Sequence, residues 1–254
     1  MGKAICISGS KGGIGKTTTA INLALSLNNK GKSVILVDAN FTSPNVGIYL
    51  GHPVTPKSIH EVLSNKIGIE EAMYIHRSGL KLIPGNISLS SLSTVNPDKL
   101  KSKVSFLKKD YDFVIIDSAA GLGKESLSAL ESCDEALIVL NPELPSVTDA
   151  LKSIRVAQEL GKEISGVVVN RNQDKYCMTI REIESMLEFP IIGVIPEDSL
   201  IKKAQAERDL VVNLYPRSEA AKSYDKVSSY LIGESYNPKE ESAWNVFKEV
   251  LGLK

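Results

Sequence analysis

The chain has 254 residues, 43% of them hydrophobic, so it is long enough for one α/β domain with a sizeable core. Its 30 lysines and arginines balance 30 aspartates and glutamates, and this zero formal charge counts against a nucleic-acid coat, whose affinity needs a basic excess. The three cysteines, Cys6, Cys133 and Cys177, form no Cys-x-x-Cys pair, which favours reduced thiols over a disulfide framework or a cysteine metal site.

The chain shows no membrane-spanning or secretory pattern. Its apolar runs are all far shorter than the roughly 20 residues that cross a bilayer. The first apolar run follows almost directly on Met1, without a charged region, a long apolar stretch or a cleavage site. We therefore expect a cytoplasmic protein.

Short apolar runs alternate with amphipathic stretches from end to end. The runs are rich in Val and Ile and are not polar at alternate positions, as expected for parallel strands buried on both faces. They cover residues 4–7, 34–37, 80–83, 113–116, 136–140, 167–169 and 191–195. Helical patterns cover residues 17–30, 97–109 and 146–160, and the first and last of these end at a glycine. The alternation predicts an α/β fold with a doubly wound, mostly parallel sheet and helices on both faces.

A glycine-rich loop follows the first predicted strand and opens the first long helix. We interpret the segment from Gly9 to Thr17 as the phosphate-binding pattern Gly-x4-Gly-Lys-Thr. Glycines let backbone N–H groups point at phosphate oxygens, and the start of a helix adds partial positive charge. Lys16 would reach the β- and γ-phosphates, and the Thr17 hydroxyl would ligate Mg²⁺. The residues expected to bind the nucleotide here are Gly12, Gly13, Ile14, Gly15, Lys16, Thr17 and Thr18.

A second lysine in this loop is not required by a generic phosphate loop. The run from Lys11 to Thr18 resembles the deviant Walker A motif of the MinD/ParA family of P-loop NTPases, which also includes the nitrogenase iron protein. The resemblance implies a homodimer that forms around ATP, in which Lys11 reaches the partner's nucleotide like an arginine finger. It also assigns catalytic roles to Lys11, Lys16 and Asn40, and magnesium to Thr17, Asp38 and Asp117.

The resemblance extends over most of the chain. Residues 34–40 look like the switch I region, and residues 113–121 resemble the Walker B strand with switch II. Both apolar strands end in an acid, and parallel strands gather such acids at one sheet edge. Residues 141–143 and 146–149 resemble the segment near the family's dimer and partner surface. The residues that resemble the adenine-framing stretches are Asn170, Arg171, Pro196, Glu197 and Asp198.

Two positions depart from the family pattern. Asn40 stands where family members usually carry the aspartate that orients the attacking water. An amide can hydrogen-bond that water but cannot take its proton. Ala119 replaces a common proline of switch II, which would loosen that loop. We therefore expect ATP hydrolysis that is slow or stimulated by a partner.

The resemblance implies a positioning ATPase of the MinD kind. Such a protein binds Mg-ATP, dimerises, engages a protein activator or cargo, and contacts the inner face of the cell membrane peripherally. Three alternatives stay open: a DNA-partitioning ATPase of the ParA kind, a non-hydrolysing nucleotide-dependent scaffold, and an iron–sulfur carrier or reductase. Ordinary ligases and small-molecule kinases of similar fold form a residual class. Zero net charge counts against the first alternative, and Asn40 favours the second. The third needs bridging cysteines, and residues 117–121 contain none.

The carboxyl-terminal part is expected to be separate from the ATPase domain of residues 1–232. Residues 233–242 are polar, with Gly and Pro, and suggest a linker. Within residues 243–254, Trp244, Phe247, Val250 and Leu251 share one face of a predicted helix. This face either binds a membrane or packs on the domain's own core. The histidines at positions 52, 60 and 76 show no metal-ligand spacing, and we interpret them as surface or packing residues.

Overall fold

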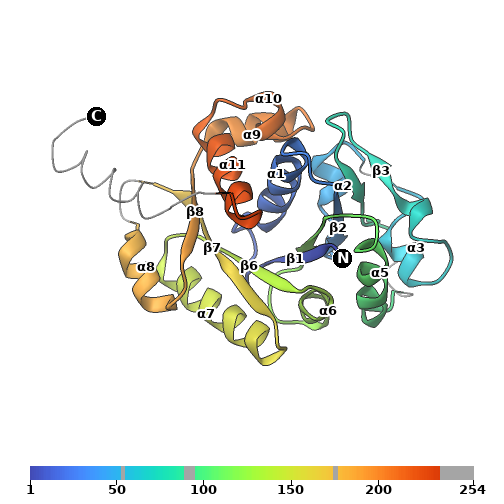
Figure 1. Ribbon diagram of the computed structural model, residues 1–254, viewed down its shortest axis with the longest axis horizontal. Coiled ribbons are helices and arrows are strands. Elements are labelled where there is room, and N and C mark those ends of the chain that lie inside the picture. Colours follow the sequence, from blue (N-terminus) through green and yellow to red (C-terminus); the bar gives the residue numbers. More distant parts are fainter. Residues whose placement is uncertain (53–54, 89–94, 174–176, 235–254) are drawn as a thin grey trace.

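All seven apolar runs form strands of one sheet (Figure 1). The computed structural model describes residues 1–52, 55–88, 95–173 and 177–234. The strands in this part of the chain are β1 (Lys3–Ser8), β2 (Val34–Ala39), β3 (Tyr74–Ile75), β4 (Lys81–Ile83), β5 (Phe113–Ser118), β6 (Glu135–Leu140), β7 (Glu163–Asn172) and β8 (Ile191–Pro196). Their order across the sheet is β3-β4-β2-β5-β1-β6-β7-β8. Every described neighbour pair is parallel except β3 with β4.

The prediction of a doubly wound α/β fold is therefore confirmed, with one strand missed. Strand β3 has two residues and pairs antiparallel with β4 at the edge of the sheet. A strand this short carries no readable periodicity. The strand order reverses direction around β1, and in open parallel sheets such a point opens a crevice at the carboxyl ends of the strands.

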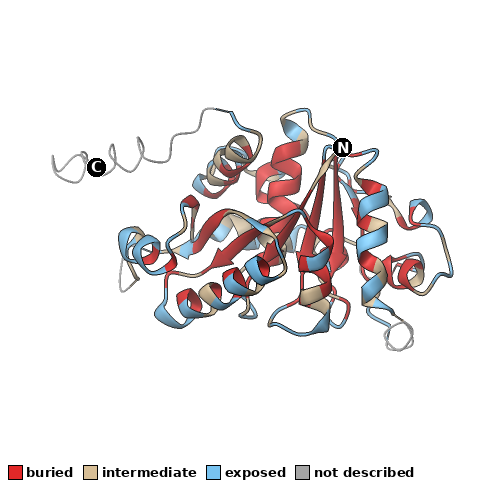
Figure 2. Cartoon of the chain, turned by 60° about the horizontal axis from the view of Figure 1, so that its bottom comes forward, coloured by how far each residue is buried: buried red, intermediate tan, exposed pale blue. Residues whose placement is uncertain are grey.

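Helices cover both faces of the sheet. One core layer packs against α1 (Lys16–Asn29), α2 (Val46–Tyr49), α9 (Ser199–Ala206), α10 (Val211–Leu214) and α11 (Glu219–Leu231). The other packs against α3 (Ile59–Leu63), α5 (Leu100–Leu107), α6 (Lys124–Ser132), α7 (Leu144–Glu159) and α8 (Ile180–Leu187). Figure 2 shows the strands buried between helices whose outer faces are exposed. This two-sided burial explains why the central strands do not alternate in polarity.

The predicted helices begin and end within a few residues of their observed bounds. The stretch 97–109 starts as a 3₁₀ turn, Pro97–Lys99, before α5 begins. A second 3₁₀ turn, Glu70–Ala72, precedes β3. Helix α11 ends close to the predicted domain boundary, and the remainder of the predicted linker and the amphipathic segment lie outside the described residues. Within the described chain, none of the helices combines the length and apolarity that a membrane crossing would need.

Strand β8 approaches helix α11 closely at Gly193. A Cβ atom at this position would lie 2.2 Å from Cγ2 of the fully buried Val227. Because valine is branched at Cβ, it has little freedom to turn away. We expect Gly193→Ala to lower the free energy of unfolding by about 1–3 kcal/mol through overpacking, measured by urea denaturation.

The double variant Gly193→Ala/Val227→Ala is the matched control for this contact. Removal of the valine methyl groups makes room for the added Cβ. The stability losses of the single variants Gly193→Ala and Val227→Ala should therefore sum to more than the loss in the double variant. Strict additivity would show that the close approach at Gly193 does not limit the packing.

Candidate functional site

The phosphate loop ends in an uncapped helix start. Helix α1 begins at Lys16, and its N-cap residue Gly15 has φ +97°, in the left-handed region that favours glycine. Gly13 is also left-handed, with φ +75°. No side chain caps α1, and its first turn contains no acid, so the N–H groups at this end are free to bind an anion.

One detail of the predicted phosphate pattern was wrong. Five residues, not four, separate Gly9 from Gly15, and the first glycine of the strict pattern falls on Ser10. The Ser10 hydroxyl lies 2.6 Å from Ser153 Oγ and donates to the Asp149 carbonyl at 3.0 Å, so it fastens the loop to helix α7. Gly9 has a different role, because a Cβ there would lie 2.6 Å from the Val139 carbonyl oxygen.

The lysine and threonine that follow the loop point into the site. Lys16 is buried, and its Nζ donates to the Lys11 carbonyl at 3.0 Å. Burial lowers the pKa of Lys16, against the opposing charge of Asp117. The Thr17 hydroxyl donates to Asp117 Oδ2 at 2.7 Å. The loop and the end of β5 therefore meet through side chains predicted to bind phosphate and metal.

Two buried carboxylates lie next to each other at the carboxyl edge of the sheet. The parallel register of β2 and β5 pairs Asp38 with Asp117, and both are fully buried. Burial raises the pKa of Asp117 to about 7, and burial together with the charge of Asp117 raises the pKa of Asp38. Asp38 accepts hydrogen bonds from the N–H groups of Asn40 and Val46, both at 3.1 Å. Asp117 Oδ1 has no hydrogen-bond partner among the described residues.

Lys11 and Thr18 lie at the rim of the loop. Lys11 is half-exposed, and its Nζ is 3.6 Å from Glu143 Oε2, in an ion pair that is loose and open to solvent. Such pairs contribute roughly 0–1 kcal/mol, so Lys11 is free to leave. The Thr18 hydroxyl accepts from Gln205 Nε2 at 3.0 Å, which joins α1 to α9.

The predicted adenine-framing residues gather at the ends of β7 and β8. Asn170 Nδ2 donates to the Ile14 carbonyl at 2.7 Å, and a Cβ on Gly15 would lie 2.0 Å from the same nitrogen. Two further residues form a loose ion pair, with Arg171 Nε 3.8 Å from Glu197 Oε2.

The two other predicted residues flank this pair. Pro196 ends β8, and Asp198 caps α9 by accepting from Leu200 N–H at 2.8 Å. All five residues lie at the carboxyl ends of β7 and β8 or directly after β8, and Asn170 contacts the phosphate loop.

Two contacts of the segment after β2 were missed by the sequence reasoning. Glu125 accepts a hydrogen bond from Thr42 N–H at 3.1 Å and another from its hydroxyl. His60 Nε2 lies 2.9 Å from the Phe41 carbonyl oxygen. Thr42 and Glu125 are 83 residues apart, and Phe41 and His60 are 19 apart, so no local sequence pattern predicts either contact.

The end of the predicted switch II, residues 113–121, is tied to the phosphate loop by its backbone. The N–H of Gly121 donates to the Ser10 carbonyl at 2.7 Å. Ala119, which replaces the usual proline, is buried.

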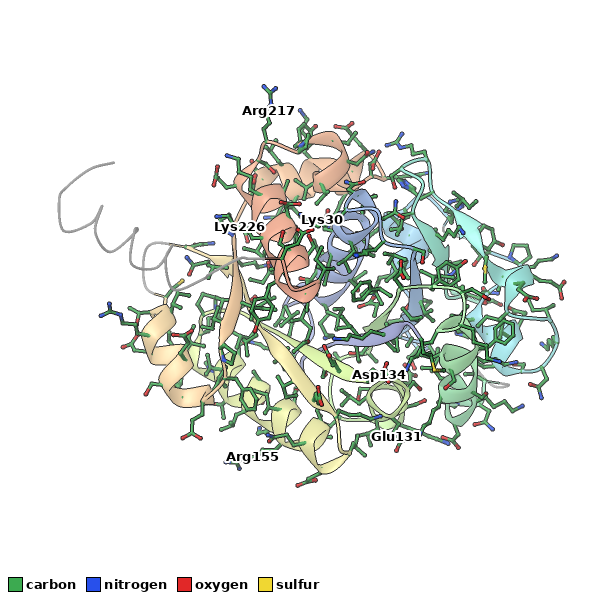
Figure 3. The ribbon with its side chains drawn as sticks, in the orientation of Figure 1. Lys30, Glu131, Asp134, Arg155, Arg217 and Lys226 are labelled. Atoms are coloured by element: carbon green, nitrogen blue, oxygen red, sulfur yellow. The ribbon has the colours of Figure 1, made fainter. Side chains whose placement is uncertain are left out.

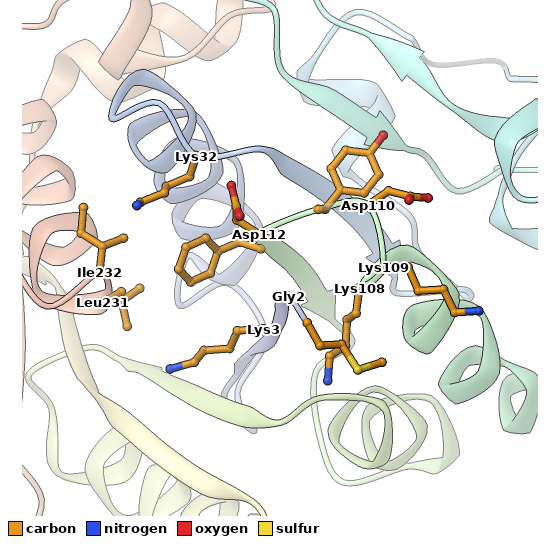
Figure 4. A pocket seen from close by; sticks show the side chains of 12 residues that line it. Gly2, Lys3, Lys32, Lys108, Lys109, Asp110, Asp112, Leu231 and Ile232 are labelled. Atoms are coloured by element: carbon orange, nitrogen blue, oxygen red, sulfur yellow. The ribbon is translucent and has the colours of Figure 1, made fainter.

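A cavity of about 460 Å³ opens at the opposite edge of the sheet, where β1 and β5 begin (Figure 4). Its lining includes Lys3 and Lys108, which pair with Glu135 and Asp134 at 2.6 Å each. These lysines are already neutralised by acids, and the cavity lies away from the phosphate loop. We therefore place the functional site at the carboxyl edge and not in this cavity.

The buried carboxylate pair should make the ligand-free protein less stable at neutral pH. A raised pKa in the folded state means that stability falls as the pH rises from the unfolded value near 4 to about 7. Asp117→Asn removes this loss and keeps an acceptor for Thr17. We expect a higher free energy of unfolding at pH 8, by about 1–3 kcal/mol, and a smaller difference at pH 5, by urea denaturation at both values.

Asp112→Asn serves as the control, because hydrogen bonds from Ser33 lower the pKa of this exposed carboxyl. Replacement of the Asp112 carboxylate by an amide should therefore not raise the free energy of unfolding at pH 8. A less stable Asp117→Asn at pH 8 would contradict the interpretation of the carboxylate pair.

Comparisons with known proteins identify relatives of the chain. A family model described as an AAA domain matches residues 2–170. A model described as 4Fe-4S iron sulfur cluster binding proteins of the NifH/frxC family matches residues 99–246. Among the described residues, no group of three or more His, Cys, Asp or Glu side chains is placed to hold a metal ion. An uncharacterized ATP-binding protein of Methanocaldococcus jannaschii is 38% identical, over 100% of this chain and 97% of its own.

Solved structures narrow the family further. The cell division ATPase MinD of Pyrococcus furiosus superposes with a TM-score of 0.89 at 33% identity, covering 92% of this chain and 99% of its own. The septum site-determining protein MinD of Pyrococcus horikoshii, complexed with Mg-ADP, superposes with a TM-score of 0.88 at 31% identity, covering 91% of this chain and 96% of its own. MinD in a MinC:MinD complex of Aquifex aeolicus superposes with a TM-score of 0.83 at 29% identity, covering 92% of this chain and 97% of its own. With its phosphate loop, its signature lysine and these relatives, the chain belongs to the MinD/ParA family of P-loop ATPases.

Proposed function

We propose that the protein binds Mg-ATP at the carboxyl edge of the sheet, hydrolyses it slowly, and uses the bound nucleotide to control its own dimerisation. The observation that carries this proposal is the position of Lys11. It lies at the exposed rim of a phosphate loop whose own lysine, Lys16, is buried. One lysine can therefore serve the bound nucleotide in cis while the other reaches outward.

The donor set fits a hard divalent cation. Asp117 carries a buried oxygen without a hydrogen-bond partner among the described residues, and Thr17 Oγ1 lies beside its other oxygen. Carboxylate and hydroxyl oxygens are the protein ligands that Mg²⁺ prefers. We assign the metal to Thr17 and Asp117, together with Asp38, which the register of β2 and β5 places next to Asp117. The bound ion would supply positive charge to the phosphates and to this carboxylate pair.

The remaining nucleotide contacts follow from the geometry of the loop. The N–H groups around Gly12 to Thr18 would cradle the phosphates, and Lys16 would exchange the Lys11 carbonyl for a phosphate oxygen. Asn170, which already binds the loop through Ile14, would contact the adenine together with its neighbour Arg171. Residues 196–198 would close the other side of the base.

The surface around Lys11 suits a partner copy. Two exposed leucines follow residues that contact the loop: Leu122 follows Gly121, whose N–H binds the Ser10 carbonyl, and Leu144 follows Glu143, the ion-pair partner of Lys11. Large apolar side chains that stay in solvent near a functional site are typical of interaction surfaces. A second copy placed here would cover both leucines and bring its own Lys11 towards the phosphates.

Two further parts of the proposal concern the cell. The Aquifex MinD is complexed with MinC, and by analogy we propose a protein activator or cargo for this chain. We also propose that residues 243–254 contact the membrane, so that a dimer with two such segments gains avidity. The DNA-partitioning alternative has less support, because the formal charge is zero. Figure 3 shows two of the basic residues, Arg155 and Arg217, on opposite sides of the molecule.

The dimer switch is tested by two lysine substitutions. Lys11→Ala should bind ATP normally but stay monomeric, whereas Lys16→Ala should bind ATP at least about tenfold more weakly. Light scattering after size exclusion, with ADP and with a non-hydrolysable ATP analogue, measures the oligomeric state, and calorimetry measures the affinity. Lys109→Ala, at the opposite edge, is the control and should behave as the wild type. Normal dimerisation of Lys11→Ala would refute its action in trans.

The hydrolysis rate is tested at Asn40. We expect basal turnover below about 1 s⁻¹, the low end for enzymes, because Asn40 cannot take a proton. Asn40→Asp should raise the rate by about tenfold if the side chain orients the attacking water. Phosphate release at saturating ATP measures both proteins. Equal rates would place the catalytic water elsewhere, and no turnover in either would favour the non-hydrolysing scaffold.

A further inference from the structure

The segment that carries Asn40 is held by residues outside the known phosphate motifs. We call residues 40–43 the switch I segment; they follow β2 directly and begin at the last residue of the predicted switch I region, residues 34–40. His60, on helix α3, is fully buried beneath it. The rings of His60 and Phe41 meet edge to face, with centroids 5.9 Å apart. The histidine therefore packs against the segment as well as bonding to it.

The two hydrogen bonds of His60 fix its tautomer. Nδ1 lies 3.1 Å from the backbone N–H of Asn86, which can only donate, so Nδ1 must accept. Nε2 lies 2.9 Å from the Phe41 carbonyl oxygen, which can only accept, so Nε2 must carry the hydrogen. The ring is therefore neutral and joins the loop after β4 to the switch I segment. Burial, which lowers the pKa of His60, agrees with this state.

A second anchor holds the same segment from the other side. Thr42 donates to Glu125 through its N–H, at 3.1 Å, and through its hydroxyl. Glu125 lies in the first turn of α6, directly after switch II. Within the segment, Asn40 Oδ1 accepts from Ser43 N–H at 3.3 Å, so the direction of the Asn40 side chain depends on the neighbouring backbone.

We propose that His60 is a positioning residue for ATP turnover: its Nε2–H holds the Phe41 carbonyl and thereby fixes the segment that presents Asn40. The consequence for turnover rests on the function proposed above. The placement of the segment itself does not, because it follows from contacts within the folded chain. The side-chain hydrogen bonds of His60 go to Phe41 and Asn86, neither of which is a predicted ligand of the nucleotide or metal, so His60 acts through Phe41.

Two amide substitutions separate the two bonds of the ring. The amide nitrogen of glutamine reaches about as far as Nε2, so His60→Gln keeps a donor to Phe41 and gives up the bond to Asn86. Asparagine reaches about as far as Nδ1, so His60→Asn keeps an acceptor for Asn86 and gives up the donor to Phe41. His76→Asn is the matched control, because His76 is also buried, with Nε2 3.3 Å from the Arg208 carbonyl, but lies away from the segment.

Amide hydrogen exchange of residues 40–46 is the direct measurement. In His60→Asn the segment should exchange about tenfold faster, while in His60→Gln and His76→Asn it should match the wild type. Turnover should follow the same order: kcat should fall about tenfold in His60→Asn, with an unchanged KM for ATP, because the phosphate loop is untouched. Global destabilisation without a local effect would instead raise exchange throughout the chain.

Three results would overturn the proposal: unchanged exchange in His60→Asn, equal defects in the asparagine and glutamine variants, or a rise in KM without a change in kcat. If the variants fail to fold, ¹⁵N NMR of the wild-type imidazole decides, since the proposal requires a hydrogen on Nε2 and none on Nδ1. A wild-type protein without ATP turnover would overturn the proposed function, and the exchange rates would then decide the role of His60 alone.

Discussion

The burial of two carboxylates side by side at the carboxyl edge of the sheet is the constraint on which the site depends. The register of β2 and β5 pairs Asp38 with Asp117, and the unfavourable burial is only partly offset by hydrogen bonds to each. Asp38 binds the N–H groups of Asn40 and Val46, so the chain after β2 must fold back over the acid. The same carboxylate pair therefore determines the backbone conformation after β2 and groups the oxygen atoms of a potential cation site.

The phosphate loop supplies the opposite polarity within reach of these acids. Helix α1 starts with uncapped N–H groups, and Lys16 is buried beside Asp117. Burial disfavours the charged form of all three groups: it raises the pKa values of Asp38 and Asp117 and lowers the pKa of Lys16. Both the acids and the lysine therefore reduce the stability of the ligand-free protein when they are charged. Sites that bind highly charged ligands commonly keep such unfavourable electrostatics and sacrifice some stability for function.

Elements marked by a local pattern of residues could be predicted from the sequence, whereas contacts between residues far apart in the chain could not. Runs rich in Val and Ile gave seven strands, because strands buried on both faces need no alternation. The two-residue β3 was too short for any pattern, and short helices such as α3 were missed for the same reason. In the site, Lys16, Asp38 and Asp117 follow from the ends of strands and loops. His60 and Glu125 could not be found this way, because only the tertiary fold brings them to residues 41 and 42.

The two anchors of the switch I segment differ in how easily they can break. The Thr42 contact with Glu125 is exposed to solvent, so water can replace it at a small net cost. The His60 contact with Phe41 is buried, and its loss would leave a donor and an acceptor unsatisfied. A movement that accompanies nucleotide binding would therefore release Thr42 first and turn the segment about Phe41. Asn40 lies on the strand side of this pivot and Thr42 on the α6 side. Because Ser43 N–H binds Asn40 Oδ1, such a turn would also change the direction of the Asn40 side chain, which couples α6 to the position of Asn40.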